Sequence, residues 1–175
     1  SNVTSSMEKA AFANTAAIRF LDFNDTYISK GSGHPSDITG ACLAVADGVK
    51  ASGAQTVLAV ATAYEVFAAL ADQVALRDAG WDHGVFVVLG SAAAASQLLG
   101  LNLEQCANAL AIGVTANIPT RQTRSGELAM WKGCATAWAA QAGVAAALLA
   151  REGMTGPTAA LRASLCVSRQ RTSTR

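Results

Sequence analysis

The stretch MWKGCATAWAAQAGVAAALLARE, residues 130–152, is the strongest indication of the fold. Alanine, the best helix former, is its commonest residue, and Gly153 follows it in the position that commonly ends a helix. Small side chains recur along it and allow another helix to approach closely; these are Ala135, Ala139, Gly143 and Ala146. We therefore predict a long helix here, packed tightly against its neighbours.

The rest of the chain has the same character. Alanine is frequent, and the alternation of apolar and polar residues that is typical of strands is scarce. Pro35 suits the first turn of a helix, and Gly100 suits the position after a last turn. Asn102 and Gln105 form an approximate capping box. The fold class is predicted to be all-α, a helical bundle whose further helices cover residues 7–23, 35–51, 56–78, 86–99 and 103–115.

One domain is predicted over residues 1–160, because no linker or fixed repeat interrupts the helical pattern. Residues 161–175 differ from it: they are rich in Ser, Thr and Arg and contain no acid and no aromatic residue. Such a composition is typical of a disordered tail, which we predict here.

Composition excludes a disordered chain and two classes of partner. The 175 residues suffice for one compact domain, and 51% of them are hydrophobic. Charged residues make up 14%, against roughly 25% in an average soluble domain, so we expect apolar faces that meet a partner. The formal net charge of +1 gives no field that attracts nucleic acid or an anionic membrane. We expect neither as a partner.

Cysteine spacing and the apolar stretches indicate the compartment. The chain has four cysteines, Cys42, Cys106, Cys134 and Cys166. No C-x-x-C pair occurs, and no histidine lies at metal-finger spacing from a cysteine, so we expect free thiols, no metal and no iron–sulfur cofactor. The first residues lack a signal-peptide pattern, and residues 85–101 are too short to cross a bilayer comfortably. We expect a cytoplasmic protein.

Two polar loops carry the residues suited to chemistry. The first combines two carboxylates, a hydroxyl, an amine and an imidazole: Asp22, Asp25, Thr26, Lys30 and His34. Asp22 and Thr26 are four residues apart, so residual helicity places them on one face. His34 precedes a helix N-terminus, where free N–H groups favour anions. The alternative is ordinary capping of the helices on either side of the loop.

The second loop and the remaining histidine add cations and a second imidazole. His83 lies in a turn before an apolar helix and is, with His34, one of only two histidines, so acid–base chemistry near pH 7 has these two candidates. Arg121 and Arg124 suit the bidentate binding of a carboxylate. Lys132 opens the next helix, where the helix dipole disfavours a cation unless an anion lies nearby. The alternative is a capping histidine and solvated surface cations.

Several short motifs occur in one order along the chain. They are LDFNDT (21–26), HPS (34–36), YEV (64–66), GWDH (80–83), LLGL (98–101), MWKG (130–133) and EGMTGP (152–157). In this order they resemble the MmgE/PrpD family, which includes 2-methylcitrate dehydratase and cis-aconitate decarboxylase, over residues 8–160. The resemblance implies a large helical domain accompanied by a smaller α/β domain, pairing as a homodimer, and no iron–sulfur cluster.

The resemblance also implies a site. The matched positions are the first Asp and the Thr of a D-F-D-D-T motif, an H-P histidine, the histidine of a G-[FW]-x-H turn and a helix-opening lysine: Asp22, Thr26, His34, His83 and Lys132. Asn24 stands where the family commonly has Asp. Family members are much longer, so we expect a helical domain that is incomplete at both ends and lacks the α/β domain. Residues 162–175 do not resemble the family.

The implied chemistry is the loss of water or carbon dioxide from a citrate-like polycarboxylate such as 2-methylcitrate, a lyase reaction. Asp22 or His83 is the candidate base. Lys132 is the candidate cation for the developing dianion, and His34 the acid for the leaving hydroxyl. Candidate groups for binding the substrate carboxylates are Thr26, Lys30, Arg121 and Arg124. The alternative is a catalytically inactive helical module that dimerises or binds a carboxylate ligand or a partner.

Overall fold

The computed structural model describes residues 4–160 of the chain. Its α-helices are α1 (Met7–Arg19), α2 (Thr39–Gly48), α3 (Gly53–Ala71), α4 (Gly84–Leu98), α5 (Leu103–Ala116) and α6 (Ala135–Arg151). Short 3-10 helices stand in the connections, at Pro35–Ile38, Leu76–Ala79, Arg121–Arg124 and Met130–Gly133. Between residues 4 and 160 there is no β-strand, only two isolated bridges, so the predicted all-α class is confirmed.

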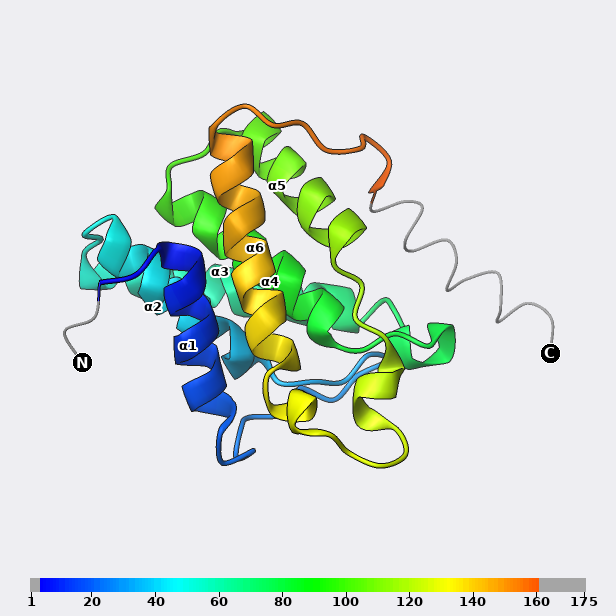
Figure 1. Cartoon of the computed structure of the whole chain (residues 1–175). Coiled ribbons are helices and arrows are strands. Elements are labelled where there is room, and N and C mark those ends of the chain that lie inside the picture. Colours follow the sequence, from blue (N-terminus) through cyan, green and yellow to red (C-terminus); the bar gives the residue numbers. More distant parts are fainter. Residues whose placement is uncertain (1–3, 161–175) are drawn as a thin grey trace.

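Helix α4 forms the centre of the bundle. Every residue from 84 to 96 is buried, and a helix that is apolar on all sides is typical of a core. Helices α3, α5 and α6 pack against it, while α1 packs against α2 and α6. Figure 1 shows α6 between α1 and α5, in front of α4. The bundle therefore closes around one strongly apolar helix.

Helices α4 and α6 cross at very short distance. A Cβ atom added to Gly143 would lie 2.5 Å from the carbonyl oxygen of Val88 and 2.6 Å from the Cβ of Ser91. Glycine is required here because α4 backbone occupies the space of a side chain. The four small residues noted in the sequence are all buried on α6: Ala135, Ala139, Gly143 and Ala146. The predicted close packing is confirmed.

Several predicted boundaries shift. The helix predicted over residues 7–23 ends at Arg19, since the chain turns away and Asp22 adopts a left-handed backbone with φ of 50°. The helix predicted over residues 56–78 ends at Ala71 and starts at Gly53, because Ser52 and Gln55 form a capping box in front of it. The loop that carries Asp22 is therefore longer than predicted.

The start of the last helix is also corrected. Residues Met130–Gly133 form a 3-10 helix, and α6 begins only at Ala135. Lys132 therefore lies in the connection before α6 and not in its first turn, so the conflict with the helix dipole does not arise. The segment predicted as one helix over residues 35–51 likewise begins with a 3-10 turn, Pro35–Ile38, before α2.

Other residues that were predicted to begin or end helices are confirmed in these positions. Asn102 and Gln105 make both hydrogen bonds of a capping box at the start of α5. Gly100 and Gly153 adopt left-handed backbone, with φ of 67° and 90°, directly after α4 and α6. A residue with a side chain is disfavoured in this conformation, so these glycines end the helices as the sequence indicated.

Helix α3 is, among the described residues, the one helix long and apolar enough to cross a membrane. It is a different segment from residues 85–101, the apolar stretch that the sequence brought forward for this property. One face of α3 is built into the bundle: Ala59, Ala63 and Phe67 are fully buried, and the Phe67 ring meets that of Phe86 at 5.2 Å between centroids. Its other face exposes Val57 and Leu58.

Three cysteines lie within the described part of the chain, all as free thiols: Cys42, Cys106 and Cys134. Cys42 is buried in α2, and burial raises the pKa of its thiol to about 12. Cys166 and the tail predicted over residues 161–175 lie outside the described residues. Among residues 4–160, no group of three or more His, Cys, Asp or Glu side chains is placed to hold a metal ion.

Candidate active site

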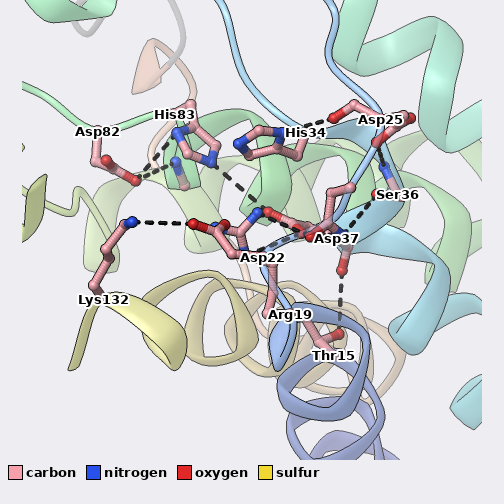
Figure 2. Close-up of polar contacts among 12 residues, drawn as sticks. Thr15, Arg19, Asp22, Asp25, His34, Ser36, Asp37, Asp82, His83 and Lys132 are labelled. Carbon is pink, nitrogen blue, oxygen red and sulfur yellow. Dashed lines mark hydrogen bonds and ion pairs between the residues drawn. The ribbon is translucent and has the colours of Figure 1, made fainter. Parts of the chain in front are cut away.

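Three connections, those between α1 and α2, α3 and α4, and α5 and α6, bring the predicted catalytic side chains together. Asp22 follows α1, and His34 directly precedes the 3-10 helix Pro35–Ile38. His83 directly precedes α4, and Lys132 lies in the 3-10 helix before α6. Figure 2 shows the four side chains gathered in one polar cluster. The tertiary structure thus joins residues that the sequence separates by more than a hundred positions.

Backbone contacts fix the loops around the histidines. Tyr27 forms an isolated bridge with Gly33, and Trp81 forms one with Thr120. A Cβ atom added to Gly33 would lie 2.8 Å from the ring of His83, so the loop passes directly across this imidazole. The positions of both histidines therefore depend on the same loop, residues 27–33.

Asp22 and Lys132 form an ion pair that reaches solvent. The Lys132 Nζ lies 3.0 Å from Asp22 Oδ2, and the two side chains are 34% and 50% exposed. Arg19, which is buried, donates from Nη2 to Asp22 Oδ1 at 2.6 Å. The hydrogen bond from Lys132 holds the pKa of Asp22 below its ordinary value, and the charge of Arg19 adds to this. Asp22 is therefore a stable carboxylate and a weak base.

The environment of His34 defines which nitrogen carries its proton. His34 Nδ1 lies 2.6 Å from the carbonyl oxygen of Asp25, and a carbonyl oxygen only accepts hydrogen bonds. Nδ1 therefore donates, which leaves Nε2 of the neutral ring as the free acceptor. The Asp25 carboxylate accepts from the Ser36 backbone N–H and from the Tyr64 hydroxyl. Burial and this last hydrogen bond raise the pKa of Tyr64 to about 12.

His83 lies deeper, with only 8% of its surface exposed. Its ring meets that of His34 edge to face, with 5.4 Å between centroids. Its Nε2 lies 3.7 Å from Asp37 Oδ2 and its Nδ1 lies 3.7 Å from Asp82 Oδ1, both beyond hydrogen-bond distance. Burial lowers the pKa of His83 despite the two carboxylates. The ring is therefore neutral near pH 7.

Asp82 ties the site to the second polar loop. It is buried and accepts from Arg124 Nε at 2.7 Å and from the Gly84 backbone N–H at 3.0 Å. Burial acts to raise the pKa of Asp82, but the interactions with His83 and Arg124 outweigh it, and the pKa lies below its ordinary value. Arg124 is thus held by Asp82, although it was predicted to bind substrate.

The other predicted binding residues stand apart from this network. Asp72, at the end of α3, has a pKa below its ordinary value, mainly because Ser29 and Tyr27 donate hydrogen bonds to it. The charge of the Lys30 ammonium lowers this pKa further. The side chains of Thr26 and Arg121 make no hydrogen bond or ion pair with another residue of the described range. Thr26 is exposed and Arg121 is half-buried.

A hollow of about 280 Å³ opens next to the cluster. Its wall includes Trp131 and Thr123, which directly precede Lys132 and Arg124 in the chain, together with Trp138 of α6. It therefore lies beside the polar groups and not on them.

Sequence reasoning missed three buried charged residues of the site: Arg19, Asp37 and Asp82. Arg19 continues the buried face of α1 that includes Ala11 and Thr15, at intervals of four residues. An arginine on such a face is the one signal that pointed to a buried partner. Asp82 stands beside His83 in the GWDH motif, but its burial is not visible in the sequence.

The burial of His83 has a consequence for stability. We expect the free energy of unfolding to decrease as the pH falls below about 6.5. The pKa of His83 is lowered in the folded chain, whereas the unfolded chain binds the proton at the ordinary value. Between the two pKa values the unfolded state holds more protons, so acid favours unfolding. Urea denaturation at about pH 7.5 and about pH 5.5 measures the effect.

A matched pair of variants assigns this pH dependence. His34→Gln leaves His83 as the sole histidine and should retain the dependence, whereas His83→Gln should lose it. Asp22 and Asp82 do not interfere, since their lowered pKa values place their titration below 3.8. An unchanged dependence in H83Q would contradict the prediction.

Fold and site together define an all-α domain with a cluster of imidazole, carboxylate and ammonium groups that is suited to acid–base chemistry. Residues 1–170 match the model of the MmgE/PrpD N-terminal domain. The match includes residues 162–170, so the expectation that residues 162–175 do not resemble the family is wrong for this part. The chain belongs to the MmgE/PrpD family, as its motifs indicated.

Curated relatives are similar over most of this chain. It is 34% identical to the 2-methylcitrate dehydratase of Escherichia coli (strain K12) over 169 residues, which cover 89% of this chain and 34% of that protein. It is 36% identical to alkylcitrate dehydratase phiI of a fungal species (strain ATCC 74256) over 168 residues, which cover 87% of this chain and 33% of that protein. The chain thus spans about a third of the length of these relatives.

Proposed function

We propose that the site serves the dehydration of an alkylcitrate such as 2-methylcitrate. The observation that carries this proposal is the meeting of the Asp22–Lys132 ion pair with the two histidine rings. Loss of water from a citrate-like acid requires a cation for carboxylate charge and a group that moves protons. The names of the relatives, 2-methylcitrate dehydratase and alkylcitrate dehydratase, support the same reaction and substrate class.

Lys132 is the proposed binding residue for a substrate carboxylate. Its ammonium is partly exposed, and its partner in the free protein is already a carboxylate, Asp22. A substrate carboxylate therefore meets the same chemistry on arrival. Thr26 and Arg121, whose side chains have no hydrogen-bond partner in the described range, are the proposed additional contacts. Arg124 already forms an ion pair with Asp82, and the charge of Lys30 acts on Asp72.

His34 is the proposed proton-transfer group. Its Nε2 is the free acceptor of the neutral ring, so it takes the proton from the carbon next to a carboxylate. The C–H electron pair forms the double bond, the C–O bond breaks, and the imidazolium returns the proton to the departing hydroxyl as water. The sequence suggested Asp22 or His83 as the base. The lowered pKa of Asp22 and the burial of His83 favour His34 instead.

Turnover is tested with the purified chain and 2-methylcitrate, by the ultraviolet absorbance of the unsaturated product. We expect turnover in the wild-type chain and a decrease in kcat of about 10²-fold in His34→Gln, because general acid–base catalysis contributes about that much. Stabilisation by the ligand without turnover would contradict the dehydratase and support a carboxylate-binding module. A cytoplasmic location is part of the same proposal. So is pairing as a homodimer, which the low content of charged residues supports.

A further inference from the structure

Asp37 is held in place from both sides of the site. It is fully buried in the 3-10 helix that follows His34. Its backbone N–H donates to the His34 carbonyl oxygen at 3.1 Å, and its own carbonyl oxygen accepts from the Thr15 hydroxyl of α1 at 3.1 Å. The carboxylate therefore has little freedom to move away from its neighbours (Figure 2).

The two oxygens of this carboxylate differ in their partners. Oδ1 lies 3.5 Å from the Asn24 amide nitrogen and 3.7 Å from Arg19 Nε. Oδ2 is buried without a hydrogen bond, and the atom it faces, His83 Nε2 at 3.7 Å, is also buried without one. Leaving two such groups unpaired in the interior costs free energy, so a contact between them is favoured once the distance shortens to about 3 Å.

Both oxygens of the other carboxylate beside His83 already have a donor. Asp82 accepts from Gly84 at Oδ1 and from Arg124 at Oδ2. The carboxylate oxygen that faces the His83 ring and has no donor is therefore Asp37 Oδ2, on the Nε2 side.

We propose that Asp37 is a positioning residue for His83: its Oδ2 accepts a hydrogen bond from His83 Nε2–H, fixes the proton of the neutral ring on Nε2, and holds the ring edge to face against His34. Its effect on turnover rests on the proposed function, but the tautomer of His83 does not. The charged and titratable groups that face the ring are Asp37, Asp82, Arg124 and His34, with Arg19 behind Asp37.

Nuclear magnetic resonance of the ¹⁵N-labelled chain tests the tautomer directly. The chain has two histidines, so His34→Gln assigns the signals of His83. At neutral pH we expect the proton of wild-type His83 on Nε2. A proton on Nδ1 in the wild-type chain would overturn the proposal, whatever any variant does.

Two substitutions distinguish the negative charge of Asp37 from its role as a hydrogen-bond acceptor. Asp37→Asn removes the charge, and we expect the pKa of His83 to fall by about one unit, because a carboxylate this close favours the imidazolium. Asp37→Leu removes the acceptor, and we expect the Nε2 tautomer to give way to a mixture. The matched control is Asp47→Asn on the exposed end of α2, which should change neither property. A folded D37N chain with an unchanged pKa of His83, or a folded D37L chain with the Nε2 tautomer unchanged, would overturn the proposal.

Steady-state kinetics distinguish the positioning role of Asp37 from the proposed dehydratase activity. In D37N we expect kcat to fall at least about tenfold with KM unchanged, because His83 is then held less firmly against His34, the proposed proton-transfer group, and a misplaced group costs up to about 10²-fold. A wild-type chain without turnover but with the Nε2 tautomer would contradict the dehydratase and leave the positioning of His83 supported. A change in KM alone would contradict the positioning role.

Discussion

Lys132→Met should lower kcat/KM for 2-methylcitrate by about 10²–10³-fold, the loss typical of removing one group that stabilises developing negative charge. The substitution keeps an unbranched side chain, one atom shorter, but removes the ammonium that faces Asp22 at 3.0 Å. Neither of the arginines that the structure describes beside this pair replaces the ammonium, since Arg19 is buried behind Asp22 and Arg124 is paired with Asp82. Steady-state kinetics with the ultraviolet assay measures the loss.

The fold should tolerate the same substitution. The Asp22–Lys132 pair is partly exposed, and such pairs contribute at most about 1 kcal/mol to the free energy of unfolding. Lys50→Met is the matched control, because Lys50 pairs with Asp47 at 3.1 Å on the surface, away from the site. K50M should retain full turnover. Turnover of K132M within a few-fold of K50M would exclude Lys132 from the reaction.

Gly143→Ala should lower the free energy of unfolding by about 2–3 kcal/mol, because the new Cβ forces α4 and α6 apart. That Cβ would lie 2.5 Å from the Val88 carbonyl oxygen and 2.8 Å from the Ala92 nitrogen, and backbone atoms of α4 have no rotamer that relieves the contact. The gain in helix propensity from glycine to alanine, about 1 kcal/mol, offsets part of this loss and is included in the expectation. Urea denaturation followed by circular dichroism measures it.

Gly53→Ala is the matched control for this prediction. Gly53 is also a helical glycine, in the first turn of α3, but a Cβ added there meets no atom within 4 Å. The chain should then be as stable as the wild type or slightly more stable, since alanine restricts the unfolded chain. Equal stabilities of G143A and G53A would show that the α4–α6 crossing has room that the structure does not indicate.

The helical elements were largely readable from the sequence. Alanine content, the capping pair at Asn102 and Gln105, and the terminal glycines act within a few residues of the chain, and those signals gave α4, α5 and the end of α6 closely. The boundaries at Arg19 and Ala135 were missed because they accompany side-chain contacts with Asp22, a local one from Arg19 and a tertiary one from Lys132. The chain leaves α1 at the point where Arg19 binds Asp22, and Lys132 lies in a 3-10 turn where it reaches the same carboxylate.

The sequence of neighbouring residues was enough to predict an all-α fold and its apolar central helix, because helix propensity and hydrophobic periodicity act over a few residues. It also showed which residue types were present to bind and react with a polycarboxylate. Folding alone brought Asp22 to Lys132 across 110 positions and enclosed Arg19, Asp37 and Asp82 around His83. The ionisation of such groups depends on burial and on charges from distant segments. Local sequence carries no record of those distances, so the chemistry of the cluster appears only once the helices have packed.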